Sequence, residues 1–106
     1  MHETMIAHSI IEEAKKHGEV REIYLELGEL GHVPPEELLA CLNSIVKWKI
    51  HPTIIKTHAK CDCGFIGHPT ILERGHDSFL IECPSCKSVP QILKGTDITI
   101  KKVVVA

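Results

Sequence analysis

Two short cysteine pairs are the clearest chemical signal in the sequence. Cys61 and Cys63 are separated by one residue, Cys83 and Cys86 by two, and nineteen residues lie between the pairs. Tetrahedral zinc takes four ligands of this kind, with zinc–sulfur bonds of about 2.3 Å. The segment around them, residues 60–95, is poor in aliphatic side chains, so we expect metal binding to stabilise its fold. The spacing predicts a structural zinc site with four thiolate ligands.

The first pair is one residue shorter than the usual C-x-x-C. His58 precedes Cys61 at H-x-x-C spacing and could take its place if the C-x-C turn is too tight. Two pairs favour a four-thiolate site over a redox dithiol, and iron, which binds the same ligands, is the alternative metal. The fifth cysteine, Cys41, lies among leucines, and we expect it to be a small buried residue. A closed zinc site has no open coordination position, so any further chemistry lies elsewhere.

A second set of candidate ligands lies in the first three residues, Met1, His2 and Glu3. An α-amino group has a reference pKa of about 7.7–8.0, so it loses its proton near neutral pH. The backbone nitrogen and imidazole of His2 then complete two chelate rings, and the backbone nitrogen of Glu3 adds a fourth donor. Four nitrogens in a plane suit Ni(II) or Cu(II). The competing interpretation is a frayed end, because chain termini are poorly ordered.

The elements that position these residues follow from periodicity and turn signals. An amphipathic helix is predicted over 4–17, with Thr4 as its N-cap and Gly18 just beyond its end. The predicted elements that follow are a half-buried strand over 20–27, a helix from Pro35 to about Lys49, and strands over 53–59 and 97–105. The sequence thus predicts an α+β fold. Two helices pack on a three-stranded sheet formed by residues 1–59 and 96–106, and a zinc ribbon is inserted at 60–95.

Composition excludes several classes of protein. The chain has 106 residues, a net charge of −2 and 4% aromatic residues, whereas a nucleic-acid binder needs a basic surface. No apolar run approaches the ~20 residues of a membrane helix. The first segment is acidic and does not resemble a secretory signal. We therefore expect a cytoplasmic protein that binds neither nucleic acid nor membrane.

Taken together, the motifs resemble those of HypA/HybF proteins, the hydrogenase-maturation nickel metallochaperones. They are MHE at the start, LELGEL, PPEELLACLNSIVK, the two cysteine pairs and the closing GTDITIKKVVV, in that order along nearly the whole chain. The resemblance implies the same α+β fold with an inserted zinc ribbon. It also implies a carrier and not an enzyme, with nickel at Met1, His2 and Glu3 and zinc at the four paired cysteines.

The resemblance also implies partners, namely a HypB-type GTPase and the large subunit of [NiFe]-hydrogenase. The chain departs from the family pattern at its C-D-C-G pair and at Lys87, which replaces a glycine after the second pair. We expect backbone strain at Lys87, because that position often needs a permissive backbone. A monomer and a dimer that exchanges the last strand or the ribbon are both open.

The remaining histidines are weaker candidates. His68 and His76 lie in the insert, where either could offer nickel a side-chain donor. The others are expected at a helix surface, a helix end, a loop and an element boundary: His8, His17, His32 and His51. Two other functions fit the cysteines, a zinc-ribbon interaction module and a rubredoxin-like electron carrier. Nickel binding that depends on His2 would exclude the first, and colourless zinc protein would exclude the second.

Overall fold

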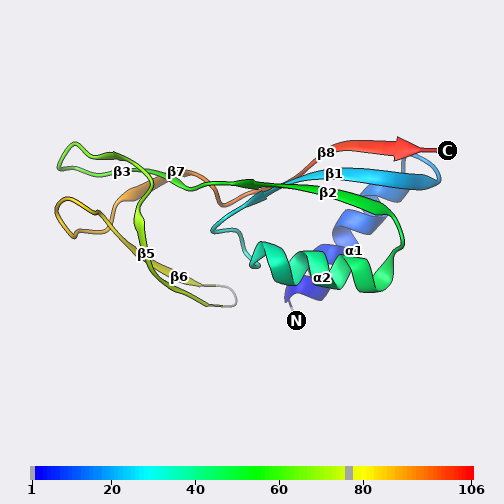
Figure 1. Cartoon of the computed structure of the whole chain (residues 1–106), viewed down its shortest axis with the longest axis horizontal. Helices are drawn as coiled ribbons and strands as arrows, with labels where there is room; N and C mark the ends of the chain where they lie inside the picture. The colour runs from blue at the N-terminus through cyan, green and yellow to red at the C-terminus, as the bar shows by residue number, and fades with distance from the viewer. Residues whose placement is uncertain (1, 76–77) are drawn as a thin grey trace.

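The computed structural model describes residues 2–75 and 78–106 and shows two lobes joined end to end (Figure 1). The helical lobe holds both helices and a three-stranded sheet with strand order β2-β1-β8. Its elements are α1 (His2–Lys15), β1 (Val20–Gly28), α2 (Pro35–Ile45), β2 (Lys49–Ile55) and β8 (Ile98–Val105). Strand β1 pairs with β2 in parallel and with β8 in antiparallel orientation. The predicted arrangement of two helices on a three-stranded sheet is confirmed.

The ribbon lobe consists of short strands in two small sheets. Its elements are β3 (His58–Lys60), β4 (Ile66–Gly67), β5 (Thr70–Arg74), β6 (Phe79–Glu82) and β7 (Gln91–Lys94). The first sheet has the order β4-β3-β7, and β5 and β6 form an antiparallel hairpin. In Figure 1 this hairpin extends back toward the start of α2. No helix in residues 2–75 and 78–106 is long and apolar enough to cross a membrane.

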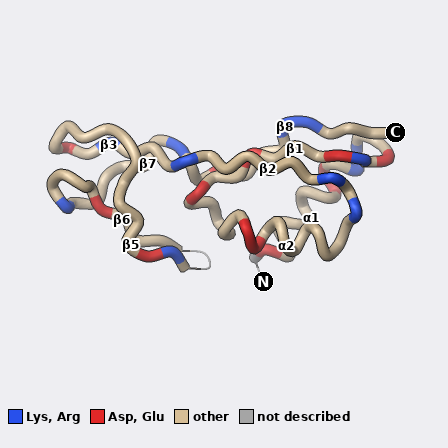
Figure 2. Tube along the Cα trace, viewed as in Figure 1, with Lys and Arg blue, Asp and Glu red and all other residues tan. Residues whose placement is uncertain are grey.

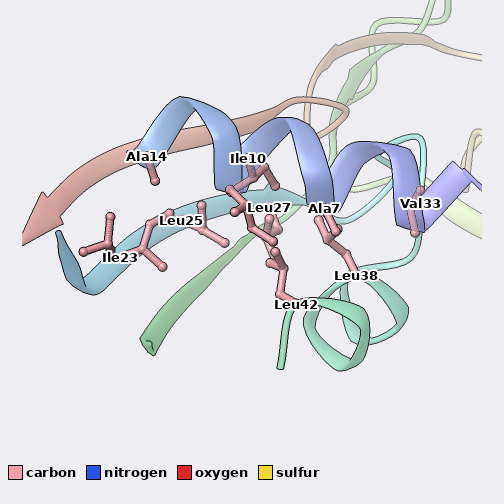
Figure 3. Close-up of a cluster of buried hydrophobic side chains, with 11 residues drawn as sticks. Ala7, Ile10, Ala14, Ile23, Leu25, Leu27, Val33, Leu38 and Leu42 are labelled. Carbon is pink, nitrogen blue, oxygen red and sulfur yellow. The ribbon is translucent and has the colours of Figure 1, made fainter. Parts of the chain in front are cut away.

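The core of the helical lobe lies between the helices and one face of the sheet (Figure 3). Ile23, Leu25 and Leu27 alternate along β1 and are each 1% exposed, as the strand pattern predicted. Figure 3 shows Ala7, Ile10 and Ala14 of α1, and Leu38 and Leu42 of α2, directed into the same cluster. Burial of these side chains holds α1 in a fixed position on the sheet.

Two predicted helix boundaries were wrong. Helix α1 begins at His2, not after Thr4, and therefore places Glu3 in its first turn, where an acidic residue suits the helix dipole. Helix α2 ends at Ile45, because Val46 adopts an extended backbone and its N–H caps the Leu42 carbonyl. Lys49, where that helix was predicted to end, is instead the first residue of strand β2.

The strand predicted over 53–59 is divided between β2 and β3. Pro52 lies within β2, and its missing N–H is tolerated because β2 is an edge strand. Strand pairing ends at Ile55 and resumes at His58; between them the Thr57 N–H donates to the carboxylate of Glu29 and not to a neighbouring strand. The chain passes from one lobe to the other at this residue.

Candidate metal centres

Each cysteine pair sits in a tight turn that follows a strand. Cys61 comes directly after β3, and its N–H donates to the Phe65 carbonyl, while the Gly64 N–H donates to the Cys61 carbonyl. Cys83 comes directly after β6, and it makes the equivalent hydrogen bonds with Ser88 and Lys87. The two turns have the same hydrogen-bond pattern although the first pair is one residue shorter. The C-x-C turn is therefore not too tight to present both sulfurs.

The two turns bring all four thiol sulfurs together. Cys61 Sγ lies 3.4 Å from Cys86 Sγ, Cys63 Sγ lies 3.6 Å from Cys83 Sγ, and all four sulfurs lie within 4.8 Å of one another. Sulfurs at the corners of a tetrahedron around zinc are about 3.8 Å apart if each bond is about 2.3 Å. The cluster therefore has the size and the donor set of a structural four-thiolate zinc site.

The charge states of the thiols point the same way. The pKa of Cys86 falls to about 6, mainly because the backbone N–H and then the hydroxyl of Ser88 stabilise its thiolate. The pKa of Cys61 rises to about 12, because the hydrogen bond from the Cys63 backbone is outweighed by the neighbouring Cys86 sulfur and by burial. Four thiolates cannot lie this close without a cation. Some of the sulfurs therefore keep their protons unless a divalent metal ion takes the place of those protons. The residues present fit zinc.

His58 lies outside the cluster. It is an exposed residue of β3, and the group of candidate ligands found among the described residues contains only the four cysteines. The fifth cysteine, Cys41, is partly buried against the core of the helical lobe. The structure thus brings together the four cysteines predicted from their spacing, and His58, the alternative ligand, is not among them.

The predicted nickel ligands lie at the start of α1. His2 is its first residue, and Glu3 follows in the first turn and is half-buried, whereas Met1 lies outside the described residues. The first N–H groups of any α-helix have no acceptor within the helix, so the fold does not require the amides of this turn for helical hydrogen bonds. Thr4 Oγ1 lies 4.0 Å from Cys41 Sγ, which places the start of α1 beside α2.

Two histidines of the zinc-ribbon insert, His68 and His76, were considered as side-chain donors to nickel. His76 lies outside the described residues. His68 is found at the boundary between the lobes, where its Nε2 lies 2.7 Å from Glu29 Oε1. Of the other histidines, His8, His17 and His32 are exposed. His51 of β2 stacks on Tyr24 of β1, with ring centroids 4.3 Å apart.

Sequence reasoning missed Glu29 and Arg74, the residues that connect the lobes. Glu29 accepts hydrogen bonds from Thr57 and His68, and Arg74 Nη2 donates to the Gly31 carbonyl at 2.5 Å. Nothing in their local pattern indicates these partners, which are 28 to 43 residues away in the chain. Only the position of Glu29 at the end of a half-buried strand could have suggested a role.

Comparison with known proteins gives a consistent result. A profile of the family described as "Hydrogenase/urease nickel incorporation, metallochaperone, hypA" matches residues 1–105. The hydrogenase maturation factor HypA of Methanosarcina acetivorans is 32% identical over 97% of this chain and 94% of its own. That of Methanocaldococcus jannaschii is 40% identical over 79% of this chain and 70% of its own.

The fold is also found among solved structures. The solution structure of the nickel metallochaperone HypA from Helicobacter pylori superposes with a TM-score of 0.53 at 15% identity, covering 97% of this chain and 96% of that one. This likeness supports the arrangement of the helices and sheets, and the sequence match supports the family. The chain, with its α+β fold and four-cysteine centre, belongs to the HypA family of hydrogenase and urease nickel-incorporation metallochaperones.

Proposed function

We propose that the chain binds Ni(II) with its first three residues and delivers it to the large subunit of [NiFe]-hydrogenase in the cytoplasm. A HypB-type GTPase is the proposed partner in delivery. The observation that carries the proposal is the family match, which begins at residue 1 and so includes the Met-His-Glu sequence. The M. acetivorans and M. jannaschii relatives are both described as hydrogenase maturation factors.

The proposed donors are the α-amine of Met1, the backbone nitrogen and imidazole of His2, and the backbone nitrogen of Glu3. Their planar arrangement would require the first turn of α1 to rearrange locally when nickel binds. The buried residues Ala7, Ile10 and Ala14 begin one turn later, so this change leaves the core contacts of the helix intact. Glu36 and Glu37 in the first turn of α2 put negative charge on the neighbouring helix, which favours a cation (Figure 2).

In this proposal the four cysteines hold zinc as a structural ion, and residues 60–95 form the zinc-ribbon domain. The chain acts as a carrier without catalytic activity, because a closed four-thiolate centre offers substrate no coordination position. The surface expected to meet the GTPase is α1 with the terminus, since the ligands of a transferred metal must be reachable. His2, Glu3 and Glu12 are the positions at which substitution would test that surface.

The proposal is tested by nickel titration of the zinc-loaded chain, comparing His2→Ala with His8→Ala. His8 is an exposed histidine of the same helix, and its substitution controls for the loss of one imidazole near the terminus. We expect His2→Ala to abolish tight nickel binding and His8→Ala to preserve it, with zinc content unchanged in both. Equal nickel binding by the two variants would exclude the terminal site.

Two further measurements distinguish the terminal amine from other donors. Residues added before Met1 convert the amine to an amide, and we expect them to weaken nickel binding nearly as much as His2→Ala does. Affinity should also fall from about pH 7.5 to about pH 6, because amine and imidazole must lose protons before they bind metal. A tagged chain that binds nickel as tightly as the untagged chain would contradict this assignment.

A further inference from the structure

The two lobes meet at a joint built around the carboxylate of Glu29. Its Oε1 accepts hydrogen bonds from the Thr57 hydroxyl at 2.9 Å, from the Thr57 N–H at 3.3 Å and from His68 Nε2 at 2.7 Å. Its Oε2 lies 3.6 Å from Lys56 Nζ. Glu29 belongs to the turn after β1, Thr57 to one of the two segments that connect the lobes, and His68 to the ribbon lobe. One side chain therefore contacts both lobes and a connecting segment.

The connecting segments are packed against this turn at backbone distance. A Cβ on Gly28 would collide with the carbonyl oxygen of Gly95, and a Cβ on Gly95 would lie 2.6 Å from Thr57 Cα. The Leu30 N–H donates to the Gly95 carbonyl at 2.8 Å, and Thr57 is completely buried. The two chain crossings are thus fixed to the helical lobe and form a firm pivot.

The ribbon contacts are of a different kind, because they are made by partly exposed side chains. The His68 side chain is 46% exposed where it meets Glu29. Arg74, in β5 of the hairpin, donates to the Gly31 carbonyl. Beside these two contacts lies a cavity of about 300 Å³ between the lobes. Its walls come from both lobes: Leu30, Pro34, Pro35 and Ile54 on one side, and Ile71 and Arg74 on the other.

The pKa of Glu29 is lowered although partial burial opposes its ionisation, because His68 and Thr57 donate hydrogen bonds to it. The carboxylate is therefore charged at neutral pH. Its buried bonds to Thr57 stabilise the pivot, whereas the bond to His68 is accessible to water and can exchange with it. The Arg74 contact, to a backbone carbonyl, can open in the same way.

We propose that the His68–Glu29 and Arg74–Gly31 contacts form a latch that holds the ribbon hairpin against the helical lobe. When both contacts open, the ribbon rotates about the fixed crossings at Thr57 and Gly95 without unfolding, and the cavity between the lobes opens to solvent. This device goes beyond nickel delivery and does not depend on it. It also gives His68 a role other than that of a nickel ligand.

The test compares the zinc-loaded double variant H68A/R74A with wild type by backbone residual dipolar couplings in a weakly aligning medium. In wild type, one alignment tensor should describe the couplings of both lobes. In the double variant, the helical-lobe tensor should no longer predict the ribbon couplings, and the alignment of the ribbon should decrease. Couplings within each lobe should remain internally consistent, since neither lobe unfolds.

The matched control is H58A/R21A, which removes an exposed histidine of β3 and an exposed arginine of β1 outside the joint. It should retain one common tensor. A common tensor in H68A/R74A as well would overturn the latch. If the double variant loses zinc, the single variants H68A and R74A are measured instead. Each should shift the ribbon couplings in the same direction by a smaller amount, and wild-type couplings in both would equally overturn the proposal. The test does not measure nickel binding, so a result that overturns the latch leaves the proposed nickel function unaffected.

Discussion

Lys87 is the residue at which one substitution should strengthen zinc binding. It is the one described non-glycine residue with a positive φ, +69°, and it lies directly after Cys86. The resemblance to the family had indicated strain here, because the family pattern has glycine at this position. In the left-handed region the Cβ of an L-residue approaches the following carbonyl oxygen, which costs about 1–2 kcal/mol. Zinc binding must offset this cost, because metal binding and ribbon folding are coupled.

The backbone strain at Lys87 is best measured as the difference in zinc affinity between the Lys87→Gly and Lys87→Ala variants. Both variants lose the exposed Lys87–Glu82 ion pair at 3.8 Å, so that contribution cancels. Glycine avoids the Cβ penalty but has about 0.5–1 kcal/mol more unfolded-chain entropy to lose, which leaves a net gain of about 0.5–1 kcal/mol over alanine. At about 1.4 kcal/mol per factor of ten, zinc should bind about two to five times more tightly to the glycine variant.

The assay is competition for zinc with a chromogenic chelator, using the untagged chain. Lys94 supplies the control, because it is also an exposed lysine of the ribbon but lies in strand β7 with negative φ. There, glycine should be the weaker zinc binder of the two variants, by about 0.5–1 kcal/mol. The sign of the glycine–alanine difference should therefore invert between the two positions. Alanine equal to or better than glycine at position 87 would refute the strain argument.

Three further outcomes are expected. Cys61→Ala should lower the zinc-to-protein ratio measured by metal analysis, and adding His58→Ala should change it no further; a drop only in the double variant would show that the histidine substitutes as a ligand. Gly95→Ala should destabilise the zinc-loaded chain in urea by about 1–3 kcal/mol more than Gly64→Ala, because a Cβ there meets Thr57 Cα at 2.6 Å whereas Gly64, also at positive φ, faces open space. With Glu29→Gln, the free energy of unfolding should decrease less on acidification than it does in wild type. The pKa of Glu29 is below its ordinary value of 4.5 in the folded chain, so its ionisation stabilises the fold above that pH and this contribution disappears as the pH falls further; identical acid titrations by circular dichroism for variant and wild type would contradict this.

The parts of the fold that sequence alone predicted depend on local periodicity. The alternation of Ile23, Leu25 and Leu27 defined β1, and the apolar stripe of Ala7, Ile10 and Ala14 defined α1, because each pattern is fixed by the geometry of a single element. The closing strand, predicted over 97–105, is found as Ile98–Val105. Where burial of one face is the main constraint on a helix or strand, the sequence alone is enough to predict that element.

The errors occur where a distant partner decides the local structure. His51 was expected at an element boundary, but pairing with β1 places it and the following Pro52 inside the edge strand β2. The break at Thr57 depends on a carboxylate 28 residues earlier in the chain. In the same way, spacing predicted four zinc ligands, but it could not predict that Cys61 lies nearest to Cys86 across the turns. Glu29 and Arg74 were missed for the same reason.

The four-cysteine centre and the proposed nickel site differ in how the chain supplies their donors, and this difference fits their proposed roles. The four sulfurs come from two turns, each fixed by its own backbone hydrogen bonds, and Cys61 and Cys83 are buried. Zinc cannot leave unless both turns separate, so it is suited to remain. The proposed nickel donors are consecutive residues at one end of a helix whose buried contacts begin only at Ala7. They can detach one at a time as each donor regains a proton or meets a competing ligand, without disturbing the core. A metal intended for transfer should be held by donors of this second kind.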